Sequence, residues 1–256
     1  MEETPHGVAD LSPQSPTDMS LNYSHLPSWL ENNRLFRFFF LIRKIFITKR
    51  VFRHFGQFAE DVTIGRLFPK SYKGFFVDVG CFHPVKYNNT YALYRRGWRG
   101  INIDIDSIKI DGFRIARPRD TNIAAAVSTT EGEVTVYSDG FYSLNTTLDP
   151  KYAAERGRYR EKTLPASRLD RLIDGTKYKD SPIDLLTVDA ESHDLEVLKS
   201  LDFERYAPKV VAVETHLQDL DAVADSELYQ FITAKGYSLA GWCGLTLVFR
   251  RRERAE

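Results

Sequence analysis

Six side chains that could do acid–base or metal chemistry follow two apolar stretches of the sequence. "DLLTVDAESHDLEVL" carries Asp189, Glu191, His193 and Asp194, and "VVAVETHL" carries Glu214 and His216. A histidine or a carboxylate within hydrogen-bond reach of a hydroxyl group can remove its proton. General-base chemistry is therefore one function that the pattern allows. The candidate catalytic residues are Asp189, Glu191, His193, Glu214 and His216.

A divalent-metal site is a second interpretation of the same residues. Asp189, Glu191 and Glu214, with Asp194 as an alternative to Glu191, offer oxygen ligands that suit Mg²⁺ or Mn²⁺. Such an ion would lower the pKa of a hydroxyl group and orient a vicinal diol. A structural interpretation also stays open for two residues, with Ser192 as the N-cap of a helix and Asp194 in its first turn.

The elements that must position these residues alternate between strand and helix. Short apolar runs predict strands at 75–79, 101–105, 122–127, 184–188 and 209–214, and a closing hairpin from 237–240 and 245–250. This alternation is typical of an α/β fold with a doubly wound, mostly parallel sheet and an antiparallel hairpin at one edge. Parallel strands end at one edge of such a sheet, and ligands bind there.

Caps and turn residues predict the limits of the helices. Thr90 is a candidate N-cap for a helix that ends at Arg96, before Gly97, and Ser167 is a candidate N-cap for a later helix. Further helices are expected at 107–116, 195–200 and 222–235, and an extra strand at 133–137. The polar stretch 138–165 predicts a long insertion over the edge of the sheet.

The turn after the first strand runs from Gly80 through Cys-Phe-His-Pro. Gly80 has no Cβ atom, so a ligand can approach the backbone closely there. A pyrophosphate needs several glycines and a helix N-terminus at this position. Here His83 and Pro84 occupy it instead, and Pro84 has no N–H to donate. A dinucleotide is therefore disfavoured.

Asp104 ends the second strand, 24 residues after Gly80. A carboxylate there can accept both hydroxyl protons of an adenosine ribose. S-adenosylmethionine carries an adenosine but no phosphate, and Asp78 or Asp189 could meet its ammonium group. Asn88 and Thr90 could bind its carboxylate. The residues favour this cofactor over NAD, and a bare turn with Asp104 as a surface acid stays an alternative.

Composition and charge narrow the class of protein. The chain has 256 residues, 43% of them hydrophobic, which suits one main domain. The 35 basic and 35 acidic residues balance, so no global attraction to nucleic acid is expected. Cys81 and Cys243 form no CxxC motif, which suits a reduced compartment. Neither a secretory signal nor a membrane-spanning stretch is visible, and a cytoplasmic protein is predicted.

Three regions are expected along the chain: a disordered lead-in at 1–30, a basic-hydrophobic helical segment at 31–56 and the main domain at 57–256. Within the second, Arg34–Phe55 holds seven basic residues and no acidic one, between clusters of Phe, Leu and Ile. One interpretation is peripheral contact with the inner face of a membrane, with basic groups among the lipid headgroups, although the charges are not confined to one face of the helix. Packing on the main domain or pairing with another subunit are alternatives.

Four blocks of the sequence resemble the FkbM-type methyltransferases. They are "FGQFAEDVTIGRLFP", "GFFVDVGCFHPVKYNNTYALYRRGWRGINID", "RDTNIAAAVS" and "IDLLTVDAESHDLEVLKSLDFERYAPKVVAVE". The resemblance implies the seven-stranded class I Rossmann-like fold and S-adenosylmethionine as cofactor. It also implies methylation of an oxygen atom, often a sugar hydroxyl of a polysaccharide or natural product. One departure is Ser192, where many relatives have glycine.

The residues and the resemblance together assign a cofactor set: Asp78, Gly80, Asn88, Thr90, Asp104, Asp120 and Asn122. The resemblance implies that Asp120 and Asn122 lie near the adenine. It also implies that the methyl acceptor and any metal meet at Asp189, Glu191 and His193.

The insertion is the candidate element for binding a small-molecule or glycan acceptor. Its tyrosines could lie against sugar rings, and its arginines could bind a phosphate or carboxylate group. These residues are Tyr142, Tyr152, Tyr159, Arg156, Arg158 and Arg160. A solvated loop is the alternative. Two other functions stay open, an NAD-dependent sugar oxidoreductase or epimerase and a non-catalytic adenosyl-binding scaffold protein.

Overall fold

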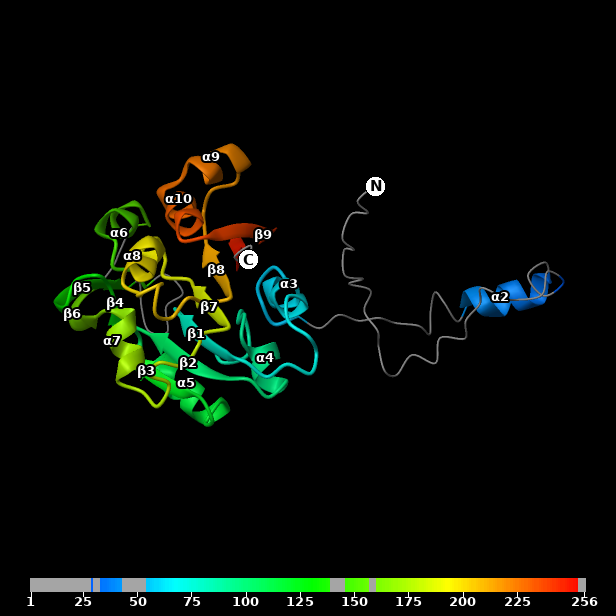
Figure 1. Cartoon of the computed structure of the whole chain (residues 1–256), viewed down its shortest axis with the longest axis horizontal. Coiled ribbons are helices and arrows are strands. Elements are labelled where there is room, and N and C mark those ends of the chain that lie inside the picture. Colours follow the sequence, from blue (N-terminus) through cyan, green and yellow to red (C-terminus); the bar gives the residue numbers. More distant parts are fainter. Residues whose placement is uncertain (1–28, 30–32, 43–53, 139–145, 157–159, 253–256) are drawn as a thin grey trace, which may run out of the picture. The chain divides into compact units, whose positions relative to one another are not determined.

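The computed structural model describes residues 29, 33–42, 54–138, 146–156 and 160–252 (Figure 1). The chain divides into two units, Met1–Phe52 and Arg53–Glu256, which are described separately. The lead-in predicted at 1–30 lies outside the described residues, apart from Trp29.

The second unit is built on a seven-stranded sheet in the order β3-β2-β1-β7-β8-β10-β9. Its strands are β1 (Phe75–Val79), β2 (Arg99–Asp104), β3 (Thr121–Ala124), β7 (Leu185–Val188), β8 (Val210–Glu214), β9 (Tyr237–Cys243) and β10 (Thr246–Arg251). The first five pair in parallel, while β10 runs antiparallel to both β8 and β9. The predicted α/β class, with a mostly parallel sheet and an edge hairpin, is confirmed.

The central strands are buried on both faces, as expected for a sheet covered by helices on both sides. On one face Val77 and Val79 pack with Leu169, Val197 and Leu198. On the other face Phe76 and Leu185 pack with Ile64, Leu93 and Trp98. Because side chains alternate along a strand, Asp78 lies on the same face as Phe76.

Seven helices of the second unit cover this sheet or follow its strands: α3 (Glu60–Arg66), α4 (Tyr91–Arg95), α5 (Ser107–Ala116), α7 (Leu169–Asp174), α8 (Asp194–Lys199), α9 (Leu220–Asp225) and α10 (Glu227–Ala234). The single helix expected at 222–235 is two helices. They meet at Ser226, whose hydroxyl accepts a hydrogen bond from the Tyr229 N–H and begins α10. The N-cap of α7 is Arg168 rather than Ser167, which is the last residue of a strand.

A second sheet of three strands contains β4 (Ala126–Val127), β6 (Arg160–Ser167) and β5 (Gly132–Ser138), in that order. The strand predicted at 122–127 is therefore wrong as one element: the chain leaves the main sheet after Ala124, and β4 pairs with β6. The predicted insertion supplies β6 and a helix, α6 (Pro150–Arg156). These elements appear at the left of Figure 1.

The first unit has one described helix of nine residues, α2 (Arg34–Ile42), which covers the start of the predicted helical segment. Its positions 43–53 lie outside the described residues. Trp29, Leu35, Phe38 and Phe39 are exposed. Across the described parts of the chain, every helix is too short or too polar to cross a membrane.

Candidate functional site

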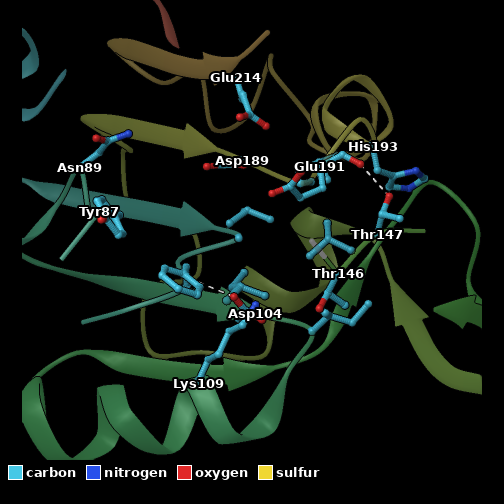
Figure 2. A pocket seen from close by; sticks show the side chains of 18 of the residues that line it. Tyr87, Asn89, Asp104, Lys109, Thr146, Thr147, Asp189, Glu191, His193 and Glu214 are labelled. Carbon is cyan, nitrogen blue, oxygen red and sulfur yellow. Dashed lines mark hydrogen bonds and ion pairs between the residues drawn. The ribbon is translucent and has the colours of Figure 1, made fainter. Parts of the chain in front are cut away.

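A cavity opens at the carboxyl ends of β1, β2, β7 and β8 (Figure 2). Of the predicted site residues, those that line it are Gly80, Asp104, Asp189, Glu191, His193 and Glu214. Parallel strands bring their ends to one edge, and this is why residues far apart in the sequence converge here.

A glycine is required at position 80 because the backbone there lies against Asp189, in the loop after the neighbouring strand β7. Its φ angle is +74°, and a Cβ atom added to it would lie 1.7 Å from the carbonyl oxygen of Asp189. The Asp189 N–H in turn donates to the carbonyl of Val79. The absence of a side chain at Gly80 therefore lets the loop that carries Asp189 lie against the turn after β1.

Asp104 lies at the cavity as predicted, with its carboxylate largely buried. Its Oδ2 accepts the Phe82 N–H at 3.0 Å and its Oδ1 accepts the Asp106 N–H at 2.8 Å. Lys109, from α5, places its Nζ 3.5 Å from Oδ1. Burial raises the pKa of Asp104, and the nearby Lys109 opposes that shift.

Asp189 and Glu214 form a carboxyl pair on the opposite wall (Figure 2). Burial raises the pKa of both side chains, and repulsion between the two raises that of Glu214 further. Two buried carboxylates side by side repel each other, so a proton bound to one of them is favoured. Burial and this repulsion therefore favour proton uptake by the pair, most strongly at Glu214.

Glu191 is held by hydrogen bonds from the insertion at 138–165, the segment predicted to bind an acceptor. The Tyr152 hydroxyl donates to Glu191 Oε2 at 2.5 Å, and the Thr147 hydroxyl donates to the Glu191 carbonyl at 2.6 Å. Glu191 and Ser192 have φ angles of +49° and +72°. Ser192, at the position of the relatives' glycine, thus takes the left-handed conformation that glycine adopts without strain.

The two histidines of the predicted set differ in placement. His193 lines the cavity within 3.3 Å of the Ser128 hydroxyl, and burial lowers its pKa, so the ring is neutral at neutral pH. His216 is 40% exposed and lies outside the cavity wall, with its Nε2 3.7 Å from Glu214 Oε2. The His216 ring stacks on Tyr152 at a centroid distance of 6.0 Å.

The helix interpretation of Asp194 is supported by its contacts. Asp194 Oδ1 accepts the Ala190 N–H at 2.8 Å and closes the turn before α8, and the N-cap of α8 is His193 rather than Ser192.

Five members of the predicted cofactor set do not line the cavity: Asp78, Asn88, Thr90, Asp120 and Asn122. Asp78 accepts hydrogen bonds from the Thr90 hydroxyl at 2.7 Å and from Asn88 at 3.2 Å. This pairing holds Thr90 at the start of α4, where its hydroxyl makes no capping bond. Direct cofactor contact by these five residues stays a prediction, and Asp78 makes its hydrogen bonds on the face of the sheet that carries α4.

Arg117 is the centre of that buried network. Its guanidinium donates to Asp120 at 2.9 Å, to Asn88 at 3.1 Å and to the Thr90 hydroxyl at 3.0 Å, and its side chain is fully buried. Asn122 donates to the Arg117 carbonyl at 3.3 Å. The network joins side chains from β1, β2 and β3, and none of these side chains lines the cavity.

The metal interpretation is only partly matched by the geometry. Among the described residues, Glu191, Glu214 and His216 have candidate ligand atoms within 4.8 Å of one another. Asp189, a member of the predicted set, is not in this group, and His216, which was not, takes its place. One of the two Glu191 carboxylate oxygens, Oε2, accepts a hydrogen bond from the Tyr152 hydroxyl.

Several cavity residues were missed by the sequence reasoning: Gln57, Phe58, Glu60, Tyr87, Asn89, Lys109, Thr146 and Thr147. The first three lie in the "FGQFAEDVTIGRLFP" block, whose resemblance to the family was the signal that could have identified them. Glu60 is buried, and its Oε2 accepts the Phe58 N–H at 2.9 Å. Of the acceptor candidates, Tyr142, Tyr159 and Arg158 lie outside the described residues.

The family described as "Methyltransferase FkbM domain" matches residues 78–239, more than half of the chain. No curated protein matches. Similar solved structures include a TehB-like SAM-dependent methyltransferase from Corynebacterium glutamicum, at 12% identity and a TM-score of 0.40, with 89% of this chain and 100% of that chain covered. Another is a methyltransferase FkbM from Methylobacillus flagellatus, at 14% identity and a TM-score of 0.45. The match covers 70% of this chain and 43% of that chain.

Proposed function

Because the chain belongs to the family of FkbM methyltransferase domains, we propose that it transfers a methyl group from S-adenosylmethionine to a sugar hydroxyl. The acceptor sugar would belong to a glycan, a lipid-linked saccharide or a natural product. The reaction is an O-methylation that leaves a methyl ether and S-adenosylhomocysteine.

The charge of the cavity wall carries this proposal. Five carboxyl residues line the described part of the wall: Glu60, Asp104, Asp189, Glu191 and Glu214. Lys109 is the one lysine or arginine among the described lining residues, and it is paired with Asp104. Such a wall attracts a cation and repels a pyrophosphate. S-adenosylmethionine, with a sulfonium, an ammonium and no phosphate, suits this charge, whereas NAD does not.

The residues would divide between the two ends of the cofactor. Asp104 and Lys109 would hold the ribose, and the acidic wall around Asp189 would face the cationic end. Bound there, S-adenosylmethionine would supply an electrophilic methyl group. The acceptor hydroxyl would then lie against the Asp189–Glu214 pair.

The pair would serve as the general base. Asp189 would take the hydroxyl proton as the methyl carbon leaves the sulfonium sulfur, with cleavage of the carbon–sulfur bond, and bonds to the acceptor oxygen. Glu214 would keep its own proton and donate it toward Asp189, which holds the accepting oxygen in place. Glu191 and the neutral His193 lie beside the pair and would orient the sugar.

A methyl-transfer assay with labelled S-adenosylmethionine and glycans from the source cells tests the proposal. Calorimetry should detect binding of S-adenosylhomocysteine to the protein and no binding of NAD. Asp189→Asn should retain that binding while transfer falls at least about a hundredfold, the usual contribution of a general base. Glu196→Gln, at a carboxyl on α8 outside the cavity wall, is the matched control and should transfer normally.

Two outcomes would reject the proposal. Binding of NAD in preference to S-adenosylhomocysteine would favour a sugar oxidoreductase or epimerase, and unchanged transfer by Asp189→Asn would remove the assigned base. Assays with and without Mg²⁺ or Mn²⁺ address the metal separately. Dependence on the ion that is lost in Glu191→Gln would place it at the group of Glu191, Glu214 and His216.

A further inference from the structure

Phe58 is a half-exposed aromatic residue in the wall of an otherwise acidic cavity. It lines the cavity with 47% of its surface exposed. The other Phe and Tyr side chains of the described wall, Phe82 and Tyr87, stack on each other at a centroid distance of 6.5 Å. Because the Phe82 N–H donates to Asp104, that pair belongs to the proposed cofactor end. The exposed Phe58 ring is left for another part of the ligands.

The Phe58 ring lies on the side of the cavity where the acceptor would react. It packs directly against the turn between β9 and β10, because a Cβ atom added to Gly244 would overlap Cγ and Cδ2 of the ring. Two positions further along, Thr246 pairs with Glu214 across β10 and β8. The ring is therefore backed by the hairpin that is paired with the strand of the carboxyl pair.

Both the backbone and the ring of Phe58 are held without a ligand. Its N–H donates to Glu60 Oε2 at 2.9 Å, at the start of α3. Behind the ring, Gly244 has a φ angle of +56°, and its carbonyl accepts the Trp242 indole N–H at 2.8 Å. A side chain that is already fixed loses little conformational entropy when a ligand packs on it. The ring is thus prepared to bind a partner with an apolar face.

Two neutral amide side chains, those of Gln57 and Asn89, line the cavity near this ring. The two segments that carry them lie together, since the Asn88 N–H donates to the Phe55 carbonyl at 3.0 Å and a Cβ atom added to Gly56 would lie 3.0 Å from Asn89 Oδ1. Within the described residues neither amide group makes a hydrogen bond. An amide can both donate and accept, as a hydroxyl group can. A ligand with an apolar face and hydroxyl groups around its edge matches this combination.

We propose that Phe58 binds the acceptor sugar, with the C–H face of a pyranose ring packed on the phenyl ring and its free hydroxyls bound by Gln57 and Asn89. Packing on a fixed aromatic ring selects flat or ring-shaped partners. The assignment rests on the proposed function and narrows its acceptor to a cyclic sugar, with acyclic polyols disfavoured. It makes Phe58 a specificity-determining residue that takes no part in the proton transfer.

The test is saturation-transfer NMR with the methyl pyranosides of glucose, galactose and mannose, each in the presence of S-adenosylhomocysteine. Wild-type protein should saturate the ring C–H protons of at least one glycoside and those of acyclic glucitol much less. Phe58→Leu, which stays apolar but has no aromatic face, should weaken binding of that glycoside about tenfold, and Phe58→Tyr should retain it. Phe231→Leu, the same change at a partly buried phenylalanine of α10 outside the cavity wall, should bind as wild type does.

The methyl-transfer assay gives an independent measurement. Phe58→Leu should raise the KM for the glycan about tenfold and leave the KM for S-adenosylmethionine unchanged. An equal rise in both KM values would place Phe58 at the cofactor and overturn the assignment. So would equal glycoside binding by wild type and Phe58→Leu, the absence of saturation for every glycoside, or equal saturation of glucitol.

Two further outcomes keep the inference separate from other effects. If Phe58→Leu does not fold, as judged by circular dichroism, Gln57→Ala decides, and unchanged glycoside affinity in that variant rejects the assignment. Glycoside binding that depends on Phe58 without any methyl transfer would support the sugar site and reject the proposed function. Methyl transfer to the glycan with an unchanged KM in Phe58→Leu would do the reverse.

Discussion

The Tyr152 hydroxyl on α6 donates a 2.5 Å hydrogen bond to Glu191 Oε2, in the loop after β7. These residues are 39 positions apart in the sequence. The contact joins the segment beside the second sheet to the acidic wall of the cavity. The expectation that the Tyr152 ring lies against a sugar is corrected, because the residue is 8% exposed and its ring stacks on His216.

Tyr152→Phe should lower the rate of methyl transfer, because Glu191 loses the hydrogen bond that positions its carboxylate. Loss of a hydrogen bond to a carboxylate costs about 1.5–3 kcal/mol, so we expect kcat to fall about tenfold or more while the KM for S-adenosylmethionine stays unchanged. Tyr206→Phe is the matched control, because the Tyr206 hydroxyl donates to Asp174 at 2.6 Å far from the cavity wall. Equal kcat values for the two variants would show that Tyr152 has no role in positioning Glu191.

Gly80→Ala should destabilise the fold strongly. The new Cβ atom would overlap the Asp189 carbonyl oxygen, so the loop after β7 must move, and the expected loss is about 3 kcal/mol or more. Gly132→Ala separates this contact from backbone strain, since Gly132 also has a positive φ, +114°, but nothing lies within 4 Å of its added Cβ. We expect about 1 kcal/mol there. Equal losses in urea denaturation would contradict the proposed role of the contact.

Asp194 should make the protein less stable as the pH rises. Burial raises the pKa of its carboxyl to about 8, whereas the pKa of an aspartate in the unfolded chain is about 4. Between these values the folded state holds a proton that the unfolded state has released, so the free energy of unfolding falls with increasing pH. Asp194→Asn cannot titrate but keeps an oxygen for the Ala190 N–H. Its unfolding free energy should depend less on pH over this range, and an identical slope would refute the assignment.

Arg117→Met should lower the free energy of unfolding, because it disrupts the buried hydrogen-bond network around Arg117. The variant leaves Asp120 and Asp78 buried without their cation, and removal of one partner from a buried pair costs about 3–5 kcal/mol. Arg114→Met provides the comparison, because Arg114 pairs with Asp111 at the surface and should change stability by less than about 1 kcal/mol. Thermal melts of both proteins measure the difference. A mild effect of Arg117→Met would mean that the network contributes little.

The α2 segment should bind anionic membranes, the partner predicted from its basic and aromatic composition. Arg34 is exposed beside Leu35, Phe38 and Phe39, which suits headgroup contact with burial of aromatic rings. We expect co-sedimentation with phosphatidylglycerol vesicles at low salt, less at high salt and little with phosphatidylcholine. Replacing Phe38 and Phe39 with serine should abolish it. Ile115→Ser, at an exposed apolar residue of the other unit, should not. Equal binding by both variants would reject the prediction.

Local patterns determined the frame of this protein. A short apolar run was sufficient to predict β1 at Phe75–Val79, and the alternation of strand and helix signals predicted α5 at Ser107–Ala116. Polar residues after the strands predicted the edge where Asp104, Asp189 and Glu214 meet. These features could be predicted because strand burial and the common edge of parallel strands follow from residues close together in the sequence.

Only the tertiary structure decided which polar side chains face the cavity. Asp78 and Asp104 both belong to strands beside the cavity. Asp78 lies one position before the end of β1 and joins the buried Arg117 network, whereas Asp104 is the last residue of β2 and contacts Lys109. The pairing of β4 with β6 and the contact of Tyr152 with Glu191 likewise join distant segments. The direction of a side chain at a strand end depends on partners contributed by other elements, and no local pattern records those partners.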